Sequence, residues 1–148
     1  MKIKYVSGYN IYKTVTVTQE VKKMLLYLYL FWIGGITYQI IELLWARHTH
    51  WSMFLAGGLC LILIDGIYNS FVNTIPILSI IVLCAVSITC VEFVTGCIFN
   101  LYLKQNVWDY SKIKGNLLGQ ICPKYTLYWM ILSIPAILFT IFIRSLFG

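Results

Sequence analysis

The chain has 148 residues, of which 60% are hydrophobic and only 11% are charged, and its mean hydropathy is +0.83. Soluble globular domains carry about 25% charged residues, so this composition excludes that class and indicates an integral membrane protein. A net charge of +6 would suggest a nucleic-acid partner for a soluble domain. We expect none here, because the basic residues cluster at the edges of apolar runs, where they anchor to lipid headgroups. These residues are Lys22, Lys23, Arg47, Lys104, Lys124 and Arg144.

Four apolar segments are long enough to cross a bilayer, which takes about 20 helical residues. They cover approximately residues 24–46, 52–70, 76–103 and 125–147. The fold class predicted from them is an all-α integral membrane protein with four transmembrane helices. A short connector helix or re-entrant helix is expected before the last span. The domain organisation is then a tail of residues 1–23 and one membrane domain, residues 24–148.

Residues 1–23 form a polar, basic tail. Alternation of Thr and Val over residues 14–18 fits a short strand or an interfacial segment, although no partner strand is visible. Thr18 could instead cap a helix that begins at Gln19. The basic start also resembles a signal peptide. However, the apolar run that follows is too long and has no small-residue exit site before Glu42, so we expect a retained span.

The distribution of basic residues barely distinguishes the two possible orientations. With the N-terminus inside, six Lys and Arg residues lie inside and five lie outside. We favour this orientation because the tail carries the densest charge beside the first span. A re-entrant segment over residues 106–122 would change the count, so the alternative remains open.

Three of the five acidic residues lie inside the apolar runs: Glu42, Asp65 and Glu92. A charged residue at the centre of a membrane helix costs about 2.5–3.5 kcal/mol on insertion scales, so such residues usually have a function. We predict that Glu42 and Glu92 face one interior cavity and share a partner or a proton. Asp65 lies near the end of its span, where it can reach water, and a functional and a structural role are equally compatible with that position.

Other polar residues follow these acids at helical spacing. Gln39 shares a face with Glu42, and Asn100 shares a face with Glu92, so we include both among the candidate binding residues. Small residues on the same faces allow helices to approach closely, within one bundle or between two copies of the chain. They include Gly35, Gly58 and Gly96.

Neither a metal site nor a disulfide is expected. The five cysteines lie in or beside apolar runs without zinc spacing, as is typical of buried free thiols. His48 and His50 could bind a metal or titrate near neutral pH, but no further ligand completes a set. An interfacial role beside Trp51 is the better interpretation of the two histidines, and we expect no cofactor.

The connector of residues 104–124 is the richest segment in polar and aromatic residue types. Asp109 is predicted to cap a short helix that starts at Tyr110, and Gly115 with Asn116 is predicted to form a turn. We expect the connector to cover one end of the polar cavity, with Asp109 and Asn116 at its mouth.

The chain lacks the motifs of nucleotide hydrolysis, serine hydrolases, zinc proteases and haem attachment. We therefore assign no catalytic residue. If ATP drives the activity, another chain must hydrolyse it.

Several specific residue combinations occur between about residues 34 and 130. They are Gly35-x-x-Tyr38-x-x-x-Glu42, Thr49-His50-Trp51-Ser52-Met53, Gly57-Gly58, Thr89-x-x-Glu92-Phe93-x-x-Gly96-x-x-x-Asn100, Val107-Trp108-Asp109-Tyr110-Ser111 and Gly115-Asn116-Leu117-Leu118-Gly119-Gln120-Ile121-Cys122. On these segments the chain resembles the CmpB-like membrane family labelled putative ABC-transporter type IV. The resemblance implies a small multispan protein with a role in transport. Two positions depart from the family pattern: Lys114 replaces an expected proline, and Asp65 is an additional acid in a span that is usually neutral.

We therefore expect a transporter or transport subunit of the cell membrane, in a bacterial plasma membrane, whose acids bind a cation, a proton or a cationic solute. Four spans enclose little volume, so besides the lipid bilayer we expect a second copy, or a membrane or ATPase subunit, as partner. One alternative is a non-transport subunit whose polar residues assemble with another protein. A second is a lipid-acting membrane enzyme that uses Asp109, His48 or His50, although it lacks a convincing nucleophile.

Overall fold

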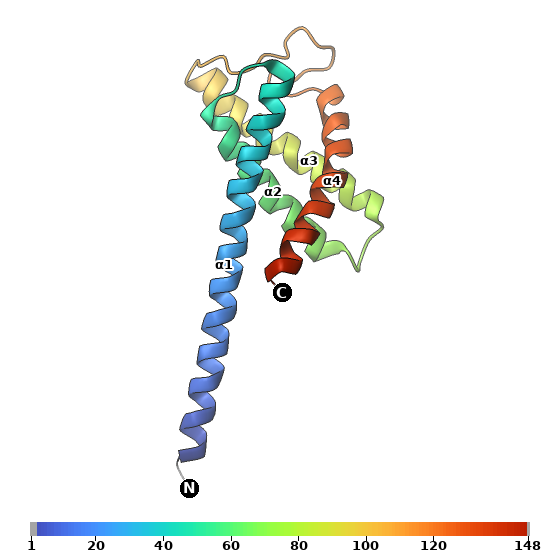
Figure 1. The fold of residues 1–148 in the computed structure, drawn as a ribbon. Helices are drawn as coiled ribbons and strands as arrows, with labels where there is room; N and C mark the ends of the chain where they lie inside the picture. Colours follow the sequence, from blue (N-terminus) through green and yellow to red (C-terminus); the bar gives the residue numbers. More distant parts are fainter. Residues whose placement is uncertain (1–2, 148) are drawn as a thin grey trace.

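The computed structural model describes residues 3–147, and their side chains from Thr16 onward. Lys2, Lys4 and Lys13, which enter the charge count of the tail, lie outside the described side chains. The described chain is helical and contains no strand, only one isolated bridge between Leu117 and Ile121. Its elements, shown in Figure 1, are α1 (Ile3–Ala46), α2 (Trp51–Phe71), α3 (Ile77–Gly96), the π-helix η1 (Cys97–Tyr102) and α4 (Pro123–Phe147).

Four helical segments in the described part are long and apolar enough to cross a membrane, which confirms the predicted all-α fold class. They are Thr16–Ala46, Trp51–Phe71, Ile77–Tyr102 and Pro123–Phe147. Successive helices run in opposite directions, so the α1–α2 link and the connector lie at one end of the bundle (Figure 1). The α2–α3 turn and the C-terminus lie at the other end.

Helix α1 has 44 residues and projects well beyond the other helices at its N-terminal end (Figure 1). At 1.5 Å per residue it is about 66 Å long, roughly twice the hydrocarbon thickness of a bilayer. The Thr-Val alternation therefore lies in a helix rather than a strand, and the helix begins at Ile3 instead of being capped by Thr18. Once an apolar span has nucleated a helix, extending it through a tail without proline costs little per residue.

Helices α1 and α2 cross in very close contact through paired glycines. A Cβ atom at Gly34 would lie 2.6 Å from the carbonyl oxygen of Gly57. A Cβ atom at Gly35 or Gly58 would lie 2.7 Å from a carbonyl oxygen of the facing helix. No side chain fits at these positions, so these glycines serve packing inside one chain and give no support for a dimer interface.

Two hydrophobic clusters hold the helices together. The first joins α2, α3 and α4, and the second joins α1, α2 and α4. The first contains Cys60, Ile64, Ile80, Cys84, Ile88 and Ile137, and the second contains Leu26, Leu30, Leu61 and Ile143. The buried cysteines of the first cluster are free thiols that pack as small apolar side chains.

Candidate binding site in the membrane

Glu92 joins three parts of the structure. This residue of α3 is only 6% exposed. Its Oε1 accepts a hydrogen bond from the Tyr110 hydroxyl at 2.8 Å, and its Oε2 accepts one from the Trp129 indole N–H at 2.9 Å. Both donors are neutral, and among the described side chains no Lys, Arg or His lies within ion-pair distance of this carboxylate. Glu92 is therefore a buried acid without a basic partner.

Stacked aromatic rings hold both donors in place. The Tyr110 ring stacks on Tyr125 with 4.4 Å between centroids, and Trp129 stacks on Tyr38 of α1 with 5.8 Å between centroids. Burial, together with the neighbouring Glu92 carboxylate, raises the pKa of the Tyr110 hydroxyl well above its usual range. Tyr110 thus remains a hydrogen-bond donor at any physiological pH.

A cavity of about 400 Å³ lies between the four helices, beside this aromatic frame. Tyr38 and Trp129 line it, and so does Ile88, which is one helical turn before Glu92 on the same face of α3. The remaining lining is largely apolar: Gly34, Thr37, Ile41, Gly57, Cys60, Leu61, Ile64, Leu132, Pro135, Ala136 and Phe139.

Glu42 lies at the same end of the bundle but has a different partner. It is half-buried near the end of α1, and its Oε2 accepts a hydrogen bond from the Thr49 hydroxyl at 2.7 Å. Among the described residues no hydrogen bond joins Glu42 to Glu92, so each acid has its own donors. Gln39 is half-buried one turn before Glu42.

Asp65 forms a bidentate ion pair with Arg144 of α4. Asp65 is fully buried, and its Oδ1 accepts hydrogen bonds from Arg144 Nε at 3.2 Å and from Asn69 Nδ2 at 3.0 Å. Arg144 Nη2 donates to Oδ2. Because Trp129 and Arg144 are separated by about 22 Å along α4, Asp65 and Glu92 belong to different sites. The ion pair ties α2 to α4.

The connector is a tight loop and not a helix. No helix lies between Tyr102 and Pro123: residues 111–115 form turns, with the Ile113 N–H bonded to the Tyr110 carbonyl, and positive φ angles at Asn106 and Gly115 bound this stretch. The prediction that Asp109 caps a short helix is therefore wrong, because no helix follows it. Asp109 makes a turn in which its carboxylate accepts hydrogen bonds from the Ser111 N–H at 2.8 Å and the Ser111 hydroxyl at 2.9 Å. These donors lower the pKa of the exposed Asp109 carboxyl.

Asn116 also acts inside the loop. Its Nδ2 donates to the Ile113 carbonyl at 2.8 Å and to the Ser111 carbonyl at 3.1 Å. Its Oδ1 accepts from the Gly119 N–H at 2.9 Å. Asn116 and Asp109 thus shape the connector, and neither donates to nor accepts from Glu92.

Asn100, in the π-helix, fastens the connector to the bundle. This buried side chain donates to Gln120 Oε1 at 2.8 Å and to the Trp108 carbonyl at 2.9 Å, and it accepts from the Val107 N–H at 2.6 Å. Gly96 makes room for the loop, since a Cβ atom there would lie 2.5 Å from Gln120 Oε1. The connector therefore lies against α3 and brings Tyr110 to Glu92.

The two histidines have structural partners in the α1–α2 link. His50 is the N-cap of α2, and its Nδ1 lies 3.3 Å from the Ser52 N–H and 2.8 Å from the Ser52 hydroxyl. His48 Nδ1 lies 2.9 Å from the Ala46 carbonyl. Within the described residues, no group of three or more His, Cys, Asp or Glu could hold a metal ion.

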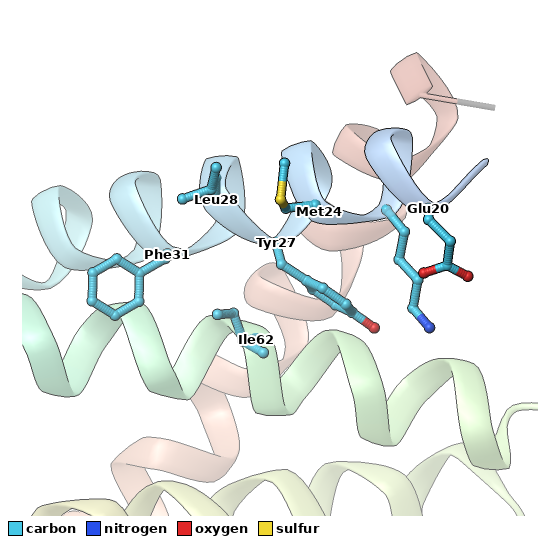
Figure 2. Close-up of a pocket in the computed structure, with 7 residues that line it drawn as sticks. Glu20, Met24, Tyr27, Leu28, Phe31 and Ile62 are labelled. Atoms are coloured by element: carbon cyan, nitrogen blue, oxygen red, sulfur yellow. The ribbon is translucent and has the colours of Figure 1, made fainter. Parts of the chain in front are cut away.

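A second hollow, of about 450 Å³, lies between α1 and α2, towards the N-terminal part of α1. Figure 2 shows the Tyr27 side chain extending from α1 towards α2. The lining is Glu20, Lys23, Met24, Tyr27, Leu28, Phe31 and Ile62. This hollow contains no buried acid and is separate from the Glu92 site.

The model of the family described as "Putative ABC-transporter type IV" matches residues 10–146. The chain belongs to this family. No curated protein and no solved structure matches it. The matched residues include all of α2, α3, η1 and the connector, so the resemblance based on the polar and aromatic motifs is confirmed.

The sequence marks Glu92 as an unusual acid but does not identify its donors. The sequence alone does not single out Trp129 and Tyr110 as these donors. A polar aromatic residue is a suitable partner for a membrane acid, since it combines an apolar ring with one donor. This property makes any tryptophan or tyrosine of the bundle a possible donor. Trp129 and Glu92 are 37 residues apart, so the sequence does not show that these two residues meet.

Proposed function

We propose that this chain is a transport subunit of the cell membrane in which Glu92 binds a proton or a cationic solute. The observation that carries the proposal is the contrast between two buried acids. Asp65 has its charge balanced by Arg144, whereas the described partners of Glu92 are neutral donors. A buried acid that serves only structure is normally neutralised by a basic group, because an unbalanced charge is costly in a membrane.

The geometry at Glu92 supports reversible binding. Tyr110 and Trp129 each occupy one carboxylate oxygen, which leaves acceptor positions on both oxygens for a proton or a cation. A proton on Oε1 would turn that acceptor into a donor and would weaken the bond from Tyr110. Occupation of Glu92 would therefore loosen the connector. Binding inside the bundle would in this way change the structure of the loop that covers its end.

The other polar candidates have secondary roles in this proposal. Glu42 and Gln39 provide polar positions on α1 at the same end of the bundle as Glu92. Asn100, Asp109 and Asn116 shape the connector that presents Tyr110. Energy for transport comes from a separate ATPase chain or from an ion gradient, and the complete pathway includes that subunit or a second copy of this chain.

The test uses the emission of Trp129 as a reporter, isolated as the difference between the wild type and Trp129→Phe. Purified full-length protein is titrated with acid, and separately with sodium, potassium and tetramethylammonium salts. We expect at least one of these titrations to change the Trp129 emission. The change should be lost in Glu92→Gln and retained in Glu20→Gln, a matched substitution at an exposed acid on α1.

An unchanged titration in Glu92→Gln would contradict the proposal. If Glu92→Gln instead lowers the yield of folded protein, and the wild type shows no titration, Glu92 serves assembly. That result would favour the alternative of a non-transport subunit.

A further inference from the structure

We infer that the cavity between the four helices binds a lipophilic cation, with its apolar groups inside the cavity and its positive charge held close to Tyr38, Trp129 and Glu92. This inference rests on the proposed function of Glu92 and names the class of ligand. It joins two features that lie next to each other, an apolar cavity and an acid without a basic partner.

The lining of the cavity selects an apolar ligand body. Apart from Thr37, Tyr38, Cys60 and Trp129, its side chains carry no polar atom. A hydrated metal ion would lose its water there without gaining a cage of oxygen ligands, so an inorganic cation has no place in this part of the site. A volume of about 400 Å³ suits an organic ligand of moderate size.

One end of the cavity is suited to positive charge. The stacked aromatic residues Tyr38 and Trp129 both line the cavity, and a cation is attracted to the face of such a ring. The Trp129 N–H is already bound to Glu92, so this ring also connects the cavity to the carboxylate. A cationic ligand would supply the counter-charge that the described side chains do not. A neutral molecule would gain nothing from Glu92, and an anion would be repelled.

The cavity is open towards lipid. Thr37 and Ile41 on α1 and Pro135 on α4 line it and are themselves exposed. In a membrane these positions face acyl chains, so the opening lies between α1 and α4, within the depth of the bilayer. A lipophilic cation partitions into the bilayer and can enter sideways, without passing the connector.

The experiment measures equilibrium binding of radiolabelled tetraphenylphosphonium to purified full-length protein, corrected for protein-free micelles. Tetraphenylborate, which has the same shape and the opposite charge, is the ligand control. We expect saturable binding of the cation only. Glu92→Gln should weaken it about tenfold or more, because a desolvated charge pair is lost, and Glu20→Gln should leave it unchanged.

A second pair of variants tests the cavity without altering the acid. Thr37→Phe places a larger side chain at the opening, and Ile36→Phe places it at the adjacent exposed position, outside the lining. We expect Thr37→Phe to weaken binding of tetraphenylphosphonium while the acid titration of the Trp129 emission remains as in the wild type. Ile36→Phe should change neither measurement.

The outcomes separate this inference from the function on which it rests. If the Trp129 titration depends on Glu92 but tetraphenylphosphonium does not bind, the ligand class is wrong and the proposed function stands. Equal binding of tetraphenylborate, or undiminished binding by Glu92→Gln, would show an apolar pocket for lipid chains and overturn the inference. If the titration does not depend on Glu92, both proposals fail.

Discussion

Trp129 on α4 donates its indole N–H to Glu92 on α3 across 2.9 Å, while its ring stacks on Tyr38 of α1. One side chain therefore links a buried carboxylate, three helices and the wall of the central cavity. Any change of charge at Glu92 acts directly on this ring, which makes the pair the most informative place to perturb the molecule.

Replacing Trp129 by Phe should keep an aromatic ring but remove the donor to Glu92. Loss of one hydrogen bond to a buried charged group costs about 1–3 kcal/mol, so thermal unfolding in detergent should begin at a lower temperature. In a double-mutant cycle with Glu92→Gln the two effects should be less than additive, because the amide introduced there would have one neutral acceptor oxygen for two donors, so that both variants weaken the same charge-assisted bond. Trp45→Phe, at an exposed tryptophan on α1, is the control and should change little.

Asp65→Asn should destabilise the protein without affecting the Glu92 site. Removing one partner of a buried ion pair leaves the other charge unbalanced and costs about 3–5 kcal/mol, although partial exposure of Arg144 reduces this figure. We expect a clear loss of folded protein, measured by thermal unfolding, with an unchanged Trp129 titration in the folded fraction. Full stability together with a lost titration would place Asp65 in the binding site instead.

The close crossing of α1 and α2 predicts opposite effects for two glycine substitutions. Gly34→Ala would push a Cβ atom against the Gly57 carbonyl oxygen and should destabilise the protein by about 1–3 kcal/mol. Gly66→Ala has no atom within 4 Å of the new Cβ and should be neutral or should stabilise by up to about 1 kcal/mol through helix propensity. Thermal unfolding of both variants measures the difference. Equal melting temperatures would show that the helices do not cross this closely.

The connector should loosen at acid pH through Asp109. Because the Ser111 donors lower the pKa of this carboxyl, its contribution to loop order is fully present above the ordinary Asp value of about 4. It is lost as the pH falls through the lower pKa of the folded loop. Limited proteolysis of the connector by an acid-active protease should therefore accelerate below about pH 4 in the wild type.

Two substitutions at the same position control for this acid effect. Asp109→Asn retains an oxygen that can accept from the Ser111 N–H but cannot titrate, so the acid-dependent step should disappear. Asp109→Ala removes the acceptor and should leave the connector protease-sensitive throughout the pH range in which the protease is active. A wild-type connector that the acid-active protease cleaves no faster at about pH 2 than at about pH 5 would show that Asp109 does not order the loop.

The sequence by itself determined the class of the molecule. Its low charge content and four long apolar runs require four helices in a membrane, because no other open structure satisfies the backbone hydrogen bonds there. The cost of burying charge likewise marked Glu42, Asp65 and Glu92 as unusual. These properties follow from local composition and need no knowledge of which helix packs against which.

Only the tertiary structure decided which partners each acid has. Asp65 finds Arg144 across 79 residues, and Glu92 finds Trp129 across 37, so among the described side chains one carboxylate has a basic partner and the other has neutral donors. Likewise, Gly34 and Gly57 have no room for a side chain only because α1 and α2 cross there. A sequence pattern states that a buried charge needs a partner, but the choice among distant candidates depends on how the helices cross.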